Sequence, residues 1–365
     1  MGPLSGVRVV EFAGLGPGPF CGMLLADLGA DVVRIDRRGT RGGLIGALGA
    51  TSLLDRGKRS IALDLKDPAD VEVVRALVRR ADVLLEGFRP GVMERLGLGP
   101  EELLGENPAL VYGRMTGWGQ TGPLSHSAGH DIGYIALTGA LGASGRPDER
   151  PAPPINLLGD FGGGGVFLAL GALAALLHAR TTGEGQVVDA AIVDGTAVLT
   201  TMLHGMLSTG SWTDRRGVNL LDTGAPFYDV YRCADGQFLA VGALEPQFYA
   251  ALLQGLGVAG DESFPDRYKP EQWPALRERF TQLFGSRTRD EWWQVFAGTD
   301  ACVAPVWSLV EATADEHNRE REVFVEVDGT VQPAVAPRFS VTPGAVGSVP
   351  EAGQHSDEIR AELGL

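Results

Sequence analysis

Short apolar runs alternate with amphipathic stretches over the first 190 residues of the chain. The runs predict buried strands at residues 7–12, 31–36, 60–65, 82–86 and 109–115. Helical spacing of apolar positions between them predicts helices at about 20–28, 67–81 and 100–106. Strands that alternate with helices are typical of a parallel sheet with right-handed crossovers. The sequence therefore predicts an α/β fold with a Rossmann-like parallel sheet.

The pattern changes beyond residue 190. A helix is predicted at about 193–207, and a polar, glycine-rich segment follows it. An Asp235-Gly236 turn between two apolar runs then predicts a β-hairpin. Helices are expected at 247–256, 273–285 and 288–297, a loop and an acidic helical stretch at 304–327, and a final helix within 350–365. We expect a large domain at 1–190 and 330–365, a linker helix and loop at 191–224, and a small α+β domain at 225–325.

The longest apolar run, residues 161–177, is glycine-rich and shorter than the ~20 residues that span a bilayer. It predicts a buried helix rather than a membrane anchor. The N-terminus lacks a charged leader followed by an apolar core, so no signal peptide is expected. A net charge of -15 argues against a surface for nucleic acid or anionic membrane.

Three cysteines, Cys21, Cys233 and Cys302, lie far apart in the sequence and show no disulfide or zinc spacing. A reduced cytosol is the natural setting, and we expect no metal site. Cys21 lies among apolar residues, which favours a buried thiol over a nucleophile.

Two different proton carriers lie at apparent helix starts within residues 129–165. His130 and Asp131 precede an apolar set with helical spacing, and Asp160 precedes four glycines and an apolar helix. A helix start leaves backbone amides unpaired and disfavours a protonated imidazole. Taken singly, each feature has a simpler structural interpretation than a catalytic one. His130 would be a hydrogen-bonded polar residue, Asp160 a helix cap, and the four glycines a site of tight packing. Residues 116–123 lie just past the fifth strand and lead directly into His130-Asp131. This placement argues that His130 faces a cleft, because ligands bind beyond the carboxyl ends of parallel strands.

The turn after the first strand resembles a dinucleotide-binding loop but is incomplete. In residues 14–19, Pro19 stands where the third glycine of G-x-G-x-x-G belongs. A nicotinamide cofactor is therefore weakly supported.

Seven cations fall between residues 34 and 59 of an otherwise acidic chain. A solvated loop face and a phosphate site are equally good interpretations of this cluster. Its members are Arg34, Arg37, Arg38, Arg41, Arg56, Lys58 and Arg59.

The methionine pair at 202 and 206 and the carboxylate of Glu245 can each be interpreted as structural or as functional. Met202 and Met206 lie four residues apart, which favours core packing over an adaptable apolar surface. Glu245 lies where a strand ends and a helix with proline at its first position begins, as a cap or solvated carboxylate would.

Several motifs resemble those of family III CoA-transferases. They occupy residues 3–11, 24–36, 56–66, 88–91 and 116–123, and the resemblance covers nearly the whole chain. Within that family, Gly129-His130-Asp131 and Gly159-Asp160 with Glu245 resemble the α-methylacyl-CoA racemase branch.

The resemblance implies that His130, paired with Glu245, is one acid/base and Asp160 the other. It also implies an interlocked homodimer, with each active site between the large domain of one chain and the small domain of its partner. The substrate would be an acyl-CoA thioester. The residues implied around CoA are Arg37, Arg38, Arg56, Lys58, Arg59, Ala62, Leu63, Arg89, Arg95, Gly117 and Tyr134.

The implied reaction inverts the α-carbon of a 2-methylacyl-CoA through an enolate, with His130 on the (S) face and Asp160 on the other. Amides at the Asp131 helix start would stabilise the enolate oxygen, at roughly 3–4 kcal/mol per donor. Burial of Asp160 would help it hold a proton. No metal or redox cofactor is needed. A family III CoA transferase with Asp160 as nucleophile, and a protein that only binds CoA esters, are the alternatives.

Overall fold

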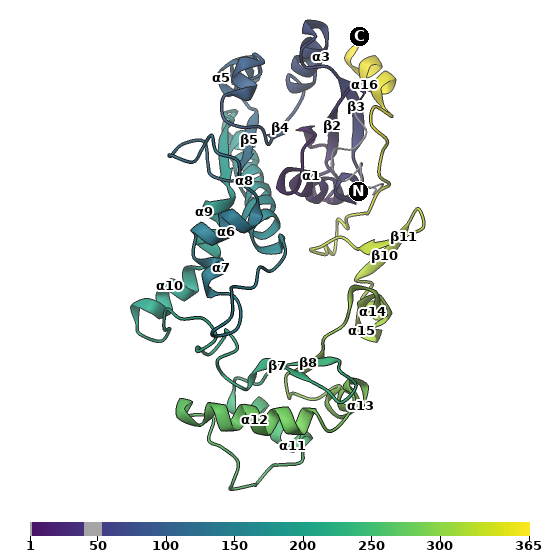
Figure 1. Ribbon diagram of the computed structural model, residues 1–365. Helices are drawn as coiled ribbons and strands as arrows, with labels where there is room; N and C mark the ends of the chain where they lie inside the picture. The colour runs from purple at the N-terminus through teal and green to yellow at the C-terminus, as the bar shows by residue number, and fades with distance from the viewer. Residues whose placement is uncertain (1, 40–52) are drawn as a thin grey trace. The chain divides into compact units, whose positions relative to one another are not determined.

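The computed structural model describes residues 2–39 and 53–365 (Figure 1). Arg41, one of the seven clustered cations, lies outside the described residues. The described chain divides into two compact units. The first comprises Met1–Thr138, Ile155–Leu199 and Asn318–Leu365, and the second Gly139–Pro154 and Thr200–His317. The predicted large domain included residues 139–154, which group with the second unit here, and the functional domain boundaries stay a prediction.

A six-stranded parallel sheet forms the centre of the first unit, which confirms the predicted α/β fold. The strand order is β3-β2-β1-β4-β5-β6, so the direction of winding reverses between β1 and β4. Loops beyond the carboxyl ends of strands diverge at such a point and form a crevice there. The strands are β1 (Arg8–Phe12), β2 (Asp31–Arg37), β3 (Arg59–Leu63), β4 (Val83–Glu86), β5 (Val111–Thr116) and β6 (Gln186–Ala191).

Helices cover both faces of this sheet, because successive strand residues point to opposite sides. Val9 packs with α1 (Pro17–Asp27) and α8 (Phe167–Thr182) on one face. Val10 packs with α3 (Pro68–Val78), α5 (Pro100–Glu106) and α16 (Ser356–Leu363) on the other. The described part of this unit also contains the 3₁₀ helix η1 (Leu53–Asp55), α4 (Val92–Arg95), α6 (Asp131–Leu137) and α9 (Ile192–Leu199).

The predicted apolar helix begins earlier than expected and starts in a different geometry. Leu157–Val166 is a π-helix, labelled η2, and α8 continues from it. Together they form the one helical run of the described residues with the length and hydropathy to cross a membrane. Leu168, Ala172 and Leu176 of this run are buried against the sheet core. The run is therefore a core helix of this unit, as predicted.

Glycines bring η2 into close contact with α9. A Cβ atom added at Gly163 would lie 2.5 Å from the Thr196 hydroxyl oxygen, and one at Gly195 would lie 1.9 Å from the Gly163 carbonyl oxygen. Neither position accepts a side chain without movement of a helix. The glycine run therefore serves tight packing, the simpler of the two interpretations of the sequence.

The C-terminal segment returns to the first unit after an antiparallel hairpin, β10 (Phe324–Val327) and β11 (Thr330–Pro333). The hairpin turns at Asp328-Gly329, both with positive φ, and it replaces part of the loop and helical stretch expected at 304–327. The chain then follows the edge of the sheet, where the His355 amide donates to the Ser60 carbonyl oxygen at 2.9 Å.

The second unit has its own core, between a three-stranded antiparallel sheet and three helices. The sheet order is β7-β8-β9, and β7 and β8 form the predicted hairpin. Its strands are β7 (Tyr228–Arg232), β8 (Phe238–Gly242) and β9 (Val303–Pro305). The helices are α7 (Ala140–Ala143), α10 (Thr201–Ser208), α11 (Pro246–Gly255), the 3₁₀ helix η3 (Pro270–Gln272), α12 (Trp273–Phe284), α13 (Arg289–Phe296) and α14 (Leu309–Ala314). The division between the units falls within α15 (Glu316–Glu320).

The helix predicted at 193–207 is two helices, α9 and α10, that meet at Thr200. No residue of α10 is buried within its unit, and Met202 is 59% exposed. The expectation that Met202 packs in a core is therefore wrong for the described chain. Periodicity identified an apolar face of this helix but could not say whether that face is covered.

Candidate active site

The loop after β5 carries His130 to the start of α6. His130 is the N-cap residue, with extended backbone angles and an exposed imidazole that makes no capping hydrogen bond. Its carbonyl oxygen accepts from the amides of Gly133 and Tyr134 at 2.8 and 3.3 Å, which closes the first turn. The side chain is therefore available for chemistry at the carboxyl edge of the sheet.

Two aromatic rings fix the path of this loop. Trp118 and Tyr134 meet edge to face, with ring centroids 4.7 Å apart. A Cβ atom at Gly117 would lie 2.0 Å from the Tyr134 ring, and one at Gly129 would lie 2.6 Å from it. Glycine at both positions lets the backbone pass close to the rings and sets the position of His130.

Asp160 is half-buried in the first turn of η2. Its backbone amide donates to Oδ1 of Asp131 at 2.7 Å, and Nδ2 of Asn156 donates to its Oδ2 at 3.3 Å. The loop after β1 reaches the same carboxyl group, since a Cβ atom at Gly16 would lie 3.3 Å from Asp160 Oδ2. Gly16 has φ +67°, a conformation that favours glycine.

The surroundings of Asp160 alter its proton affinity. Burial raises the pKa of its carboxyl group, the Asn156 hydrogen bond lowers it, the Asp131 charge raises it and the His130 charge lowers it, with a net rise. His130 and Asp160, the two predicted proton carriers, therefore interact electrostatically in one site. Perturbed titration beside the crevice of an α/β sheet is typical of active sites.

Tyr134 and Arg89 belong to the same cluster. Burial raises the pKa of the Tyr134 hydroxyl, the charge of Asp160 raises it further, and the charge of Arg89 lowers it. Arg89 and Arg95 lie just beyond β4, and both are exposed. The carboxyl ends of β4 and β5 thus bring together His130, Asp160 and three of the residues expected at CoA: Gly117, Tyr134 and Arg89.

A second group of expected CoA residues lies at the carboxyl ends of β2 and β3. The Arg38 amide donates to the Leu63 carbonyl oxygen at 3.1 Å, and Ala62 is half-buried beside it. The Arg38 guanidinium contacts Asp70 at 2.6 Å but stays half-exposed, and Arg37 is exposed.

The four other described cations of the cluster have carboxylate partners inside the unit. Arg34 lies 2.8 Å from Asp36. Lys58 Nζ, with no exposed surface, lies 2.8 Å from Glu11. Arg56 is buried against Asp27 at 2.6 Å. Arg59 begins β3, at the amino edge of the sheet, where it contacts Asp31 and Glu362.

Glu245 lies in the second unit, exposed at the N-cap of α11. Its expected pairing with His130 of another chain stays a prediction. Within its unit Glu245 is close enough to Cys302 for its charge to add to the rise that burial causes in the pKa of that thiol.

The sequence interpretation gave no role to Asn156 or Gly16. Asn156 lies four residues before Asp160, one turn away on a helix, so a spacing signal was present. Gly16 comes from a distant loop, and no local pattern connects it with Asp160. The helix-start position of Asp131 does not indicate that its side chain accepts from the Asp160 amide, because the two residues are 29 positions apart.

Comparison with known proteins matches residues 4–356 to CoA-transferase family III. The chain is 51% identical to a mouse protein and 49% identical to a human protein, each named alpha-methylacyl-CoA racemase. The alignments cover 99% of this chain in both cases and 93% and 94% of the relatives. The fold is similar to that of a CaiB/BaiF family protein from Brucella suis, with a TM-score of 0.84, 28% identity and 99% of each chain covered.

Proposed function

The chain belongs to CoA-transferase family III, and we propose that it acts there as an α-methylacyl-CoA racemase. The reaction inverts the α-carbon of a 2-methylacyl-CoA thioester by moving one proton off one face and adding one to the other. The observation that carries the proposal is the junction of the two segments at the carboxyl edge of the sheet: His130 is the N-cap residue just before Asp131, and Oδ1 of Asp131 accepts from the Asp160 amide at 2.7 Å. Inversion needs two proton carriers on opposite faces of one carbon, and these are two residues of different type.

In one direction, neutral His130 removes the α-proton and the thioester becomes an enolate. Protonated Asp160 then donates its proton to the opposite face, which leaves an imidazolium and a carboxylate. The reverse direction begins from that state, so the two groups exchange roles and no co-reactant is consumed. Each positioned acid or base contributes roughly 10²–10⁴-fold to the rate.

The raised pKa of Asp160 supports its part in this scheme. An aspartate with its ordinary pKa is almost always ionised at neutral pH and rarely holds a proton to donate. Burial and the Asp131 charge both favour the protonated form. The backbone amide of Asp131, at the first position of α6, is the donor that we propose for the enolate oxygen.

We propose that the CoA moiety lies along the carboxyl edge, among Arg37, Arg38, Arg89 and Arg95, with Ala62, Leu63, Gly117 and Tyr134 beside it. These arginines are exposed and lie beyond strand ends, where a phosphate can reach them. Lys58 is fully buried against Glu11 and Arg59 pairs with Asp31 at the amino edge, so we propose that they act by holding β3.

The wider setting follows from the same proposal. The chain works without a separate cofactor, since CoA is part of the substrate, and its setting is fatty acid metabolism in the cytoplasm. We propose a homodimer in which Glu245 of one chain reaches His130 of the other. An exposed Glu245 and an α10 without buried residues are compatible with such an assembly. No nucleic-acid or membrane partner is proposed.

The family name itself favours one alternative, a CoA transferase in which Asp160 attacks the acyl-CoA. That chemistry requires a second carboxylic acid and produces a covalent adduct on Asp160. Binding of CoA esters without chemistry is the other alternative.

Proton NMR of a racemic 2-methylacyl-CoA in D₂O, without a second acid, separates the three. Racemase activity replaces the α-proton by deuterium and inverts a single enantiomer. CoA transfer that appears only after a free acid is added, with no α-exchange, would contradict the proposal and favour the transferase. Binding with neither exchange nor transfer would leave the third alternative.

A further inference from the structure

We infer that the Asp131 side chain is a positioning residue for Asp160. Its carboxylate holds the main chain of Asp160 in place and supplies a fixed negative charge beside the Asp160 carboxyl group. The inference rests on the proposed function and deepens it, because it gives the Asp131 side chain a task apart from that of the Asp131 amide.

The contact between the two residues satisfies a backbone donor that η2 leaves open. Asp160 is the fourth residue of this π-helix, whose first amides have no acceptor within the helix. Oδ1 of Asp131 accepts from the Asp160 amide at 2.7 Å. A residue of α6 therefore caps a second helix at the residue that would carry the proton.

The site is built to allow this approach. The Asp131 side chain is buried, with 7% of the residue exposed. A Cβ atom at Gly159 would lie 2.3 Å from its Oδ1 and 2.8 Å from Ile135. Only glycine at position 159 lets the carboxylate reach the next amide without displacement of α6.

The charge of Asp131 has few competitors around Asp160. Among the described residues, the charges that act on the Asp160 carboxyl group are those of Asp131 and His130. The Asp160 charge in turn raises the pKa of the Tyr134 hydroxyl. The loop before α1 contributes uncharged Gly16. The atoms of α1 and α9 that lie nearest to the glycines of η2 belong to Pro17, Phe20, Ile192, Thr196 and Leu199, none of which titrates.

Two substitutions separate anchoring from charge. Asp131→Asn keeps an oxygen acceptor for the Asp160 amide and removes the negative charge. Because that charge raises the pKa of Asp160, its removal shifts the titration of Asp160 to lower pH. Asp131→Ala removes both acceptor and charge, so the backbone anchor is lost as well.

Carbon-13 NMR of aspartate carboxyl groups measures the titration directly, with the Asp160 resonance assigned from its loss in Asp160→Asn. In the direction in which Asp160 donates the proton, we expect Asp131→Asn to shift the Asp160 midpoint and the alkaline limb of kcat/KM together to lower pH. At neutral pH we expect kcat to fall several-fold with KM unchanged. Asp131→Ala should lower kcat about tenfold further. Asp82→Asn is the matched control, because Asp82 also accepts a backbone amide, that of Arg8 at 2.8 Å, at the far edge of the sheet.

An Asp160 midpoint that stays or rises in Asp131→Asn overturns the inference, as does equal activity of the Asn and Ala variants. The NMR titration does not depend on turnover. Failure of the proposed function appears separately, as wild-type protein that does not exchange the α-proton.

Discussion

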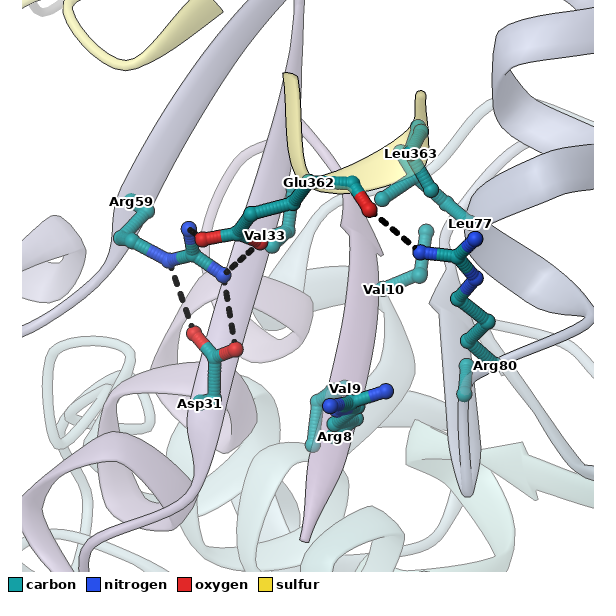
Figure 2. Close-up of a pocket in the computed structure, with 11 residues that line it drawn as sticks. Arg8, Val9, Val10, Asp31, Val33, Arg59, Leu77, Arg80, Glu362 and Leu363 are labelled. Carbon is teal, nitrogen blue, oxygen red and sulfur yellow. Dashed lines mark hydrogen bonds and ion pairs between the residues drawn. The ribbon is translucent and has the colours of Figure 1, made fainter. Parts of the chain in front are cut away.

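The two edges of the parallel sheet hold charged residues in different ways. At the amino edge, Arg59 lies 2.7 Å from Asp31 and 2.8 Å from Glu362, and Arg80 donates to the Glu362 carbonyl oxygen at 2.6 Å (Figure 2). At the carboxyl edge, Asp160 receives one long side-chain hydrogen bond and the nearby His130 imidazole is exposed.

The charged residues of the amino edge stabilise the fold, whereas those of the carboxyl edge can gain or lose a proton. Arg59 joins the start of β2 to α16, and its pKa is raised because its carboxylate partners favour the charged form. Asp160 is half-buried with little hydrogen-bonding compensation, so burial raises its pKa above the ordinary value of an aspartate. A pocket of about 320 Å³ does open at the amino edge, but Arg59, Asp31 and Glu362 in its wall are paired with one another. This pocket is therefore a structural gap between paired charges rather than a site with groups available for chemistry.

The largest expected effect tests the carboxyl edge. Asp160→Asn and His130→Gln keep approximate shape and remove one proton carrier each. We expect either to lower the rate of inversion by roughly 10²–10⁴-fold, with CoA-ester binding retained. The double variant should lose little more, because the two residues act as a unit. Chiral chromatography of product formed from a single enantiomer measures the rate, and a wild-type rate in either variant would rule out the assignment.

Lys58→Met tests a charge that stabilises the fold. Glu11 is fully buried, and burial raises its pKa to about 7 although Lys58 lowers it. Removal of one partner of a buried pair costs about 3–5 kcal/mol of unfolding free energy. In the variant, the pKa of the remaining Glu11 carboxyl group is higher in the folded protein than in the unfolded chain. Stability therefore falls as pH rises between these two pKa values. The loss of stability caused by Lys58→Met should be greater at pH 8 than at pH 5.

Urea denaturation of wild type and variant at the two pH values measures this loss. Lys66→Met is the matched control, since Lys66 is exposed, and it should change stability by less than about 0.5 kcal/mol. A loss in Lys58→Met that is equal at both pH values would contradict the role given to Glu11.

The sheet was predictable because its strands are buried on both faces and form continuous apolar runs, such as residues 82–86. His130 and Asp160 were predictable as candidates because each precedes a helical apolar pattern beyond a strand. The contacts that complete the site around these two residues were not predictable. The bond from Asp160 to Asp131 and the approach of Gly16 join segments far apart in sequence, and a π-helix has no period that residues 157–166 could display.

A turn dipeptide predicted a hairpin only where the flanking sequence also indicated strands. The Asp-Gly dipeptide at 235–236 predicted a hairpin correctly because two apolar runs flank it. The same dipeptide at 328–329 turns β10 into β11, but acidic residues around it favoured a helical stretch. The partners of Lys58 and Arg59 were equally hidden, since Glu11 and Asp31 are 47 and 28 residues away.

Gly163→Ala tests the scaffold that supports Asp160. The added Cβ atom would lie 2.5 Å from the Thr196 hydroxyl oxygen and 2.7 Å from its amide nitrogen, so α9 must shift. We expect a loss of about 1–3 kcal/mol of unfolding free energy, measured by thermal or urea denaturation. Gly105→Ala in α5, where a Cβ atom meets nothing within 4 Å, should be neutral or slightly stabilising. Equal effects of the two substitutions would show that α9 tolerates the methyl group.

The smallest expected effects separate the two edges most directly. Arg59→Gln removes contacts of a partly exposed arginine, which are worth about 0–1 kcal/mol of stability, and we expect KM for the acyl-CoA to stay within about twofold. Arg89→Gln removes an exposed cation beyond β4, and loss of one charge-assisted contact to phosphate should raise KM about tenfold. Steady-state kinetics at low ionic strength measures both, because salt screens such contacts. A tenfold rise in KM for Arg59→Gln would instead make the amino edge part of the CoA site, which would require Arg59 to exchange Asp31 for a phosphate.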